Sequence, residues 1–147
     1  MKAILHATAG GLALVMISVF WSATLISELF GTEEAVAGVK TGILWAMAGL
    51  IPAMMATGIS GAVLGKGWRS PVVTRKMRRM RIIAANGLCI LLPSAVFLAL
   101  RAQAGQFDVW FYAVQAVELM AGAVNIWLLG QNMRDGFSLS RRRIASV

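Results

Sequence analysis

Four long apolar stretches dominate the sequence, at residues 3–29, 41–65, 82–101 and 109–133. Each reaches or exceeds the ~20 residues that an α-helix needs to cross the hydrocarbon core of a bilayer. With 59% hydrophobic residues, the chain is too apolar for an ordinary soluble domain. Inside a bilayer the backbone polar groups must be satisfied by the protein itself, which favours helices. We therefore predict an all-α, integral membrane four-helix bundle that forms a single domain over residues 1–136.

The basic residues fall unevenly between the two sides of this predicted bundle. Twelve of the fourteen lysines and arginines lie at Lys2, in the connector 66–81 or after the fourth stretch, and only Lys40 and Arg101 lie on the other side. Because basic residues concentrate on the cytoplasmic side of membrane proteins, we predict that both termini are cytoplasmic. The connector could also bind anionic lipid headgroups. Since it offers almost no aromatic side chains for stacking on bases, the net charge of +8 does not predict a nucleic-acid partner.

Two segments outside the apolar stretches have their own expected structure. In the connector 66–81 we expect a turn at Ser70 and Pro71, followed by a basic helix at the membrane surface that leads into the third stretch. We expect residues 137–147, which are rich in serine and arginine, to form a disordered basic tail on the cytoplasmic side.

Prolines and small residues predict how the helices bend and pack. Pro52 and Pro93 lie about halfway along the second and third stretches, and each removes a backbone hydrogen bond, so we expect both helices to be kinked there. A stripe of small residues along the second stretch allows another helix to approach closely. Its members are Gly42, Ala46, Gly49, Ala53, Ala56 and Ser60, and the first stretch has a comparable face in Gly11, Val15, Ser18 and Ser22. We expect these two helices to pair tightly, although the stripe could instead contact a second copy of the chain or a partner membrane protein.

Glu118 is the acidic residue that lies deepest within an apolar stretch. Gln115, Glu118 and Asn125 share one helical face by their spacing, so we predict an intramembrane polar site that points away from lipid. Asn86 and Lys40 are further polar candidates for this site. We expect Lys40 to be too shallow for a direct ion pair with Glu118 unless its helix is tilted.

Two interpretations of Glu118 remain open. A protonated Glu118 could donate to one of the carbonyls that Pro52 and Pro93 leave free, and would then only hold helices together. Alternatively, Glu118 could carry protons or contact a substrate beside the two kinked helices.

His6 is the only histidine in the chain and predicts a possible cofactor site. It begins the first helix, and Gly10 and Gly11 follow about one turn later, where missing side chains leave room for a flat macrocycle. This pattern is a weak signature of b-type haem with His6 as an axial ligand of the iron. A methionine, or His6 of a second protomer across a two-fold axis, would have to supply the other ligand. The alternative is a histidine that is hydrogen-bonded to Asn86 or Asn125.

Other chemistry is poorly represented in the sequence. We find no serine, histidine and acid set, paired-carboxylate motif, metal-ligand cluster or phosphate-binding loop, so we do not expect catalysis by side chains alone. The nine methionines are more typical of flexible core filling than of a path for copper. Cys89 lies inside the third stretch, where we expect it to serve as a small packing residue.

Several short segments together resemble those of a known group of proteins. They are Phe20-Trp21, Ser27-Glu28-Leu29-Phe30, Val39-Lys40, Arg78-Arg79-Met80, Ala85-Asn86-Gly87, Phe111-Tyr112, Glu118-Leu119 and Asn132-Met133-Arg134-Asp135-Gly136. The chain resembles small, poorly characterised four-helix integral membrane proteins of proteobacteria, which implies a location in the bacterial inner membrane. The first stretch alone is also similar to membrane b cytochromes and to copper-resistance-type membrane domains, which place a histidine early in a helix.

Three functions follow as hypotheses. The first is a small inner-membrane bundle that holds a hydrophobic cofactor, b haem, for electron transfer or haem handling. The second is a scaffold or assembly subunit of a larger membrane complex, for which the small-residue stripe and the lack of a catalytic set are the motivation. The third is a small proton-coupled transporter that uses Glu118.

Overall fold

Long helices make up almost all of the computed structural model, which describes residues 2–65 and 71–144 and contains no strand among them. The elements are α1 (Lys2–Phe30), α2 (Glu33–Gly65), α3 (Pro71–Asn86), the π-helical turn η1 (Gly87–Leu91), α4 (Leu92–Gln103) and α5 (Val109–Ile144). Because α3, η1 and α4 follow one another without a break, they form one long helical segment. The described chain thus has four helices that are long and apolar enough to cross a membrane, as predicted.

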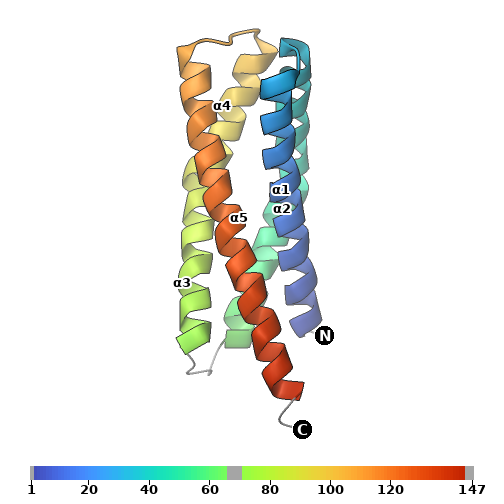
Figure 1. Ribbon diagram of the computed structural model, residues 1–147, viewed down its shortest axis with the longest axis vertical. Coiled ribbons are helices and arrows are strands. Elements are labelled where there is room, and N and C mark those ends of the chain that lie inside the picture. Colours follow the sequence, from blue (N-terminus) through green and yellow to red (C-terminus); the bar gives the residue numbers. More distant parts are fainter. Residues whose placement is uncertain (1, 66–70, 145–147) are drawn as a thin grey trace.

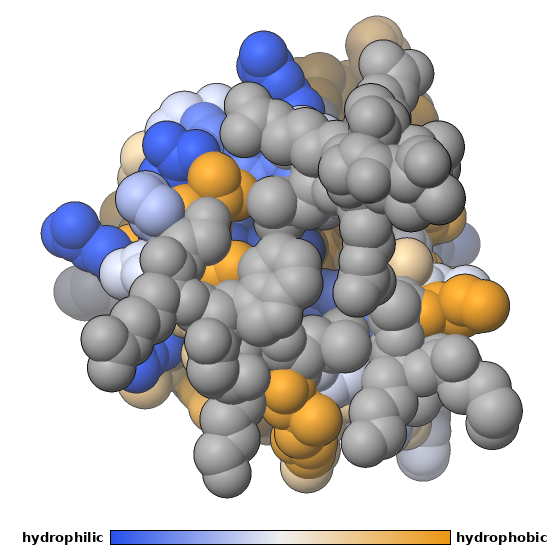
Figure 2. Space-filling model, turned by 90° about the horizontal axis from the view of Figure 1, so that it is seen from below, coloured by the Kyte–Doolittle hydropathy of each residue, from blue (hydrophilic) through white to orange (hydrophobic). Residues whose placement is uncertain are grey.

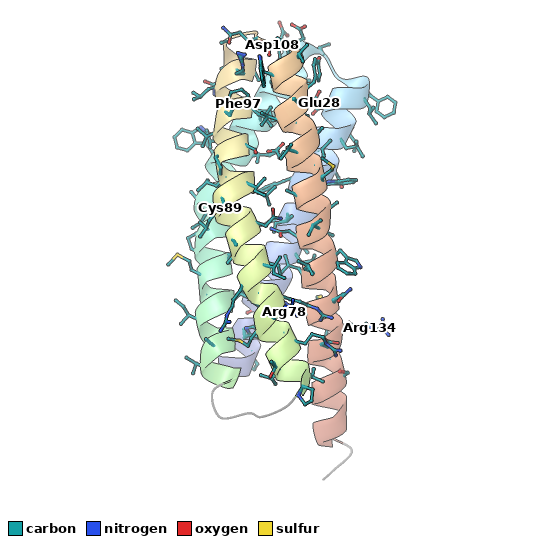
Figure 3. The ribbon with its side chains drawn as sticks, turned by 90° about the vertical axis from the view of Figure 1, so that its left-hand side faces the viewer. Glu28, Arg78, Cys89, Phe97, Asp108 and Arg134 are labelled. Carbon is teal, nitrogen blue, oxygen red and sulfur yellow. The ribbon has the colours of Figure 1, made fainter. Side chains whose placement is uncertain are left out.

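The four long segments run up and down in a bundle (Figure 1). Helix α1 packs against α2 and α5, and α4 packs against α2 and α5, which closes the bundle into a ring. Both termini lie at the same end (Figure 1), where Arg78 and Arg134 also lie (Figure 3). We call this the basic end. Glu28 and Asp108 lie toward the opposite end (Figure 3).

Helix α2 begins earlier than the apolar stretch that predicts it, which starts at residue 41. The hydroxyl oxygen of Thr32 accepts a hydrogen bond from the backbone N–H of Ala35 at 3.3 Å, so Thr32 caps the helix. Glu33 and Glu34 then occupy the first turn, where negative charge is favoured by the helix dipole. This start adds about two turns to α2 ahead of the apolar stretch.

The two helix prolines have different local consequences. Pro52 lies inside α2, which continues through it as an α-helix. Pro93 lies in the first turn of α4, directly after the π-helical turn η1, where the backbone N–H of Leu92 donates to the carbonyl of Gly87. Proline cannot donate the usual backbone hydrogen bond, and a π-turn is one way to accommodate this within a helix.

Several polar side chains lie in the interior of the bundle beside an apolar core, and many large apolar side chains face outward. Lys40 is 1% exposed and Asn125 is also 1% exposed, whereas Phe30 is 84% and Trp45 77% exposed. At the basic end, hydrophilic side chains lie beside hydrophobic ones around the rim of the bundle (Figure 2). A soluble protein rarely exposes so much continuous apolar surface, so this distribution favours a multi-pass membrane protein.

Helices α1 and α2 pair as predicted, α2 partly through the expected face and α1 through a different one. The buried residues of α1 include Ala9, Ala13 and Ile17, while Val15 of the predicted face is 60% exposed. On α2, a Cβ atom added at Gly42 would meet nothing within 4 Å. Farther along the same stripe, however, Ala53 is buried, a Cβ atom at Gly49 would lie 3.7 Å from Met16 of α1, and the Ser60 hydroxyl lies 3.1 Å from His6 of α1. The spacing of small residues therefore identified part of the contact face of α2 but the wrong side of α1.

The basic segments also differ in part from expectation. Helix α5 continues to Ile144, so residues 137–144 are helical and the prediction of a disordered tail there is wrong. Near the basic end, Asp135 of α5 lies 2.7 Å from Arg79 and 3.7 Å from Arg75, and these ion pairs join α5 to α3. Pro71 begins α3 and confirms a helix in the second part of the connector, while the expected turn at Ser70 falls outside the described residues.

Candidate functional site

A large cavity lies between α2 and α3 in the half of the bundle nearer the basic end. Its volume is about 780 Å³, within the range typical of ligand pockets. Helix α2 packs chiefly against α1 and α4 and much less against α3, which leaves this space beside α3. The wall is mostly apolar and is completed by Ile17 of α1 and Asn125 of α5.

His6 forms part of the cavity wall and is held by α2. Its Nδ1 lies 3.1 Å from the carbonyl oxygen of Thr57 and 3.1 Å from the hydroxyl of Ser60. A carbonyl can only accept, so Nδ1 carries the proton and donates it. The other ring nitrogen, Nε2, then keeps its lone pair, and it has no hydrogen bond among the described residues. A Cβ atom at Gly61 would lie 3.0 Å from the His6 ring, so a side chain there would displace the imidazole.

The same wall carries thioethers and cationic groups. Five methionines contribute to it: Met47, Met54, Met55, Met77 and Met80. Lys76 and Arg81 of α3 are the basic members, and both come from the segment that the sequence predicts as a basic helix. The cavity therefore combines an imidazole, several soft thioether sulfurs and two positive charges around an apolar interior.

Asn86 and Asn125 form a hydrogen-bonded pair between α3 and α5, in which Asn125 is buried and Asn86 is half-buried. The side-chain N–H groups of Asn86 donate to Oδ1 of Asn125 at 2.8 Å and to the carbonyl of Ala121 at 2.9 Å. The side chain of Asn125 donates in turn to the carbonyl of Ile83 at 3.5 Å. The hydrogen-bond partners of His6 lie on α2, so the alternative prediction that it pairs with one of these asparagines is wrong.

A second polar cluster lies farther from the basic end, between α2 and α5. Nζ of Lys40 lies 2.6 Å from Oε2 of Glu118, and their side chains are 1% and 13% exposed. The side-chain N–H of Gln115 also donates to Oε2 of Glu118, at 3.3 Å. The expectation that Lys40 is too shallow for this ion pair is wrong. Glu118 accepts from Lys40 and Gln115 in this structure, and the suggested hydrogen bonds to proline-freed carbonyls are not formed.

The residues predicted to form one intramembrane polar site thus divide between two places. Gln115, Glu118 and Lys40 form the second cluster, while Asn125 belongs to the wall of the large cavity. Of the two glycines beside His6, Gly10 faces Thr57 of α2, and neither it nor Gly11 lines the large cavity.

Three further residues were missed by sequence reasoning. Thr57 and Gly61 of α2 hold and accommodate His6, and their spacing of four along a helix is the only signal that could have associated them. Glu28, near the end of α1, has a buried carboxylate oxygen, Oε1, that has no hydrogen-bond partner among the described residues. The sequence shows that Glu28 is an acid within a predicted helix, but it does not show which residues of other helices lie beside it. Cys89, which was expected to pack inside the bundle, is exposed on its surface.

A small cavity of about 50 Å³ lies beside the second cluster, and Glu118, Thr24 and Trp21 contribute to its wall. Among the described residues, no three histidine, cysteine, aspartate or glutamate side chains lie close enough together to hold a metal ion. No family model, no curated protein and no solved structure matches the chain.

Proposed function

We propose that this chain is a small protein of the bacterial inner membrane, with both termini in the cytoplasm, that holds b-type haem in the cavity between α2 and α3. The observation that carries the proposal is His6, whose Nδ1 is fixed by the Thr57 carbonyl while its ring forms part of a large apolar cavity. Histidines that bind metals commonly donate their other ring nitrogen to a carbonyl or carboxylate in this way.

The chemistry of the cavity wall fits this cofactor. Haem iron is held by histidine alone or by histidine with methionine, and five methionine side chains share the cavity with His6. A methionine can therefore complete the iron site within one chain, and a second protomer is not required. The apolar wall suits the macrocycle, and Lys76 and Arg81 can pair with its two carboxylates.

Each group has a separate part in this proposal. The hydrogen bond from His6 to Thr57 sets the tautomer and the orientation of the imidazole. The leucine, isoleucine and methionine side chains of the wall exclude water. A bound haem would supply one-electron transfer, and nothing in the arrangement provides a further reacting side chain.

The membrane orientation rests on charge and exposed apolar surface. Arg78 and Arg134 lie toward one end (Figure 3), and large apolar side chains such as Trp45 and Trp110 are exposed on the surface of the bundle. Basic residues mark the cytoplasmic side. Anionic lipid headgroups are the partners we expect at this end.

The visible absorption spectrum of protein purified from haem-supplied cells tests the cofactor directly. We expect a Soret band in the wild type, and at least about a tenfold loss of bound haem in His6→Ala, because second-sphere changes alone often cost that much. Gly11→Ala on the same helix is the matched control, since its Cβ would meet nothing within 4 Å. It should keep the full band.

Circular dichroism of each variant separates loss of haem from loss of the fold. The proposal fails if the folded wild-type protein shows no Soret band, or if His6→Ala retains an unchanged one. Substituting the cavity methionines one at a time by leucine should change the spectrum in the variant that loses the second iron ligand.

A further inference from the structure

The large cavity opens sideways, between α2 and α3, onto the outer surface of the bundle. Some of the side chains that line it are also more than half exposed, so they border its opening. Ile59 of α2 is 63% exposed, Met55 of α2 is 59% exposed, and Leu88 of η1 is 62% exposed. All three are apolar. In a bundle whose outer surface faces lipid, this opening joins the cavity to the hydrocarbon region of the bilayer.

Two cationic side chains line the part of the cavity nearer the basic end. Lys76 is half-buried and Arg81 is exposed. Neither has an ion pair among the residues that the structure describes, since Asp135 of α5 pairs with Arg79 and Arg75 instead. Placing a charge beside an apolar wall is unfavourable unless it is paired, so an anionic group at this position would be stabilised.

The depth of the cavity matches one leaflet of a bilayer. Arg81 directly precedes the apolar stretch 82–101, and Lys76 lies about 7.5 Å farther toward the basic end, at ~1.5 Å per residue. In the other direction the wall continues to Leu92, about 16 Å along the helix from Arg81. Half of a hydrocarbon core of ~30 Å is about 15 Å. The two cations therefore lie at the level of the headgroups, and the apolar wall extends to about the middle of the bilayer.

We propose that the haem-free protein holds one anionic phospholipid in this cavity, with an acyl chain between α2 and α3 and the phosphate at Lys76 and Arg81. The lipid enters sideways from the leaflet at the basic end, past Met55 and Ile59. Lipid tails are as apolar as the cavity wall, so the phosphate and the two cations supply most of the preference for the cavity over the surrounding bilayer.

A lipid held in this way differs from headgroups that gather at the basic end, because its acyl chain occupies the cavity. An anionic lipid is favoured over a zwitterionic one, since a choline headgroup would bring a further positive charge toward Lys76 and Arg81. Haem, which also combines an apolar body with acidic groups, would take the place of this lipid.

Native mass spectrometry of the full haem-free chain in detergent, titrated with phosphatidylglycerol or phosphatidylcholine, tests the site. We expect one phosphatidylglycerol to be retained per chain and phosphatidylcholine to bind much more weakly. Lys76→Met/Arg81→Met should weaken phosphatidylglycerol binding about thirtyfold, because each basic residue near an anionic headgroup contributes roughly a factor of five. Arg78→Met/Arg134→Met is the matched control. It removes two exposed arginines that do not line the cavity, and it should bind phosphatidylglycerol as the wild type does.

Gly58→Phe tests whether the acyl chain lies in the cavity. Gly58 is part of the wall, and a Cβ atom there would meet nothing within 4 Å, so the ring can fill part of the space. This variant should release most of the bound phosphatidylglycerol. Gly42→Phe on the same helix is the control, because Gly42 is also open but lies outside the cavity wall.

Circular dichroism identifies the variants that keep the fold. Equal retention of the two lipids by the wild type, or unchanged binding in folded Lys76→Met/Arg81→Met, would overturn the headgroup site. Full binding in folded Gly58→Phe would overturn the position of the acyl chain. Since the protein is free of haem throughout, these outcomes are independent of the Soret band.

Discussion

Lys40 is one of the largest fully buried side chains in the part of the chain that the structure describes, and removing its charge gives a quantitative test of the second polar cluster. Lys40→Met keeps most of the side-chain volume but leaves Glu118 without the ammonium group that lies 2.6 Å from its Oε2. Removing one partner of a buried ion pair typically costs about 3–5 kcal/mol. We expect a loss of this order in the free energy of unfolding.

Protonation of the remaining acid sets an upper limit to that loss. Adding a proton to a glutamate at pH 7 costs about 3.7 kcal/mol, because the reference pKa of this side chain is about 4.3 and one pH unit corresponds to about 1.36 kcal/mol. The folded variant can therefore accept a proton at Glu118 and lose about 3–4 kcal/mol at pH 7. The loss in the free energy of unfolding should shrink by about 1.4 kcal/mol for each pH unit of acidification. Toward higher pH it should grow, until it reaches the cost of leaving Glu118 ionised without its partner.

Unfolding free energies measured in bicelles by steric trapping, between about pH 5 and about pH 8, would show this dependence. The double variant Lys40→Met/Glu118→Gln is the matched control. It should regain most of the loss, because replacing a whole buried ion pair by uncharged groups is often close to neutral. The reasoning is refuted if Lys40→Met is as stable as the wild type at pH 7, or if its loss is the same at every pH.

Two further substitutions, with Gly11→Ala as a control, test packing inside the bundle. Gly122→Ala would place a Cβ atom 3.0 Å from the Trp21 ring, whose Nε1 donates to the Leu119 carbonyl at 2.9 Å. We therefore expect the variant to lose about 1–3 kcal/mol in the free energy of unfolding, measured by thermal or denaturant unfolding. Gly11→Ala, with open space around its Cβ, should change stability by less than about 0.5 kcal/mol, and equal losses in the two variants would contradict this packing. Asn132→Leu should stabilise the protein by about 1–3 kcal/mol, because both amide atoms of this buried side chain lack partners. A destabilised Asn132→Leu would show instead that its amide is bound by water or ligand.

The helical class and the four long apolar helices followed from the sequence because a stretch of apolar residues is a local property. The position of Lys40 was misjudged for a local reason as well. The apolar stretch begins at residue 41, but the cap at Thr32 starts α2 at Glu33. Lys40 therefore lies about 10 Å along α2, at ~1.5 Å per residue, and Glu118 lies about 14 Å along α5. Their depths match closely enough for the long lysine side chain to span the difference.

Which faces meet was decided by the tertiary structure. Spacing placed Gln115, Glu118 and Asn125 on one side of a helix, but could not show that Asn125 faces Asn86 while Glu118 faces Lys40. Nor could it show that His6 is held by Thr57 beside a large cavity, because these residues come from different helices.

The sequence by itself determined that the chain forms long apolar helices with its basic residues concentrated on one side, since length, hydropathy and charge are properties of each segment alone. Only the tertiary structure decided where polar groups meet and where space remains. The rotation of each helix about its axis depends on all its neighbours together. That rotation brings Lys40 to Glu118, and the separation of α2 from α3 leaves the cavity beside His6.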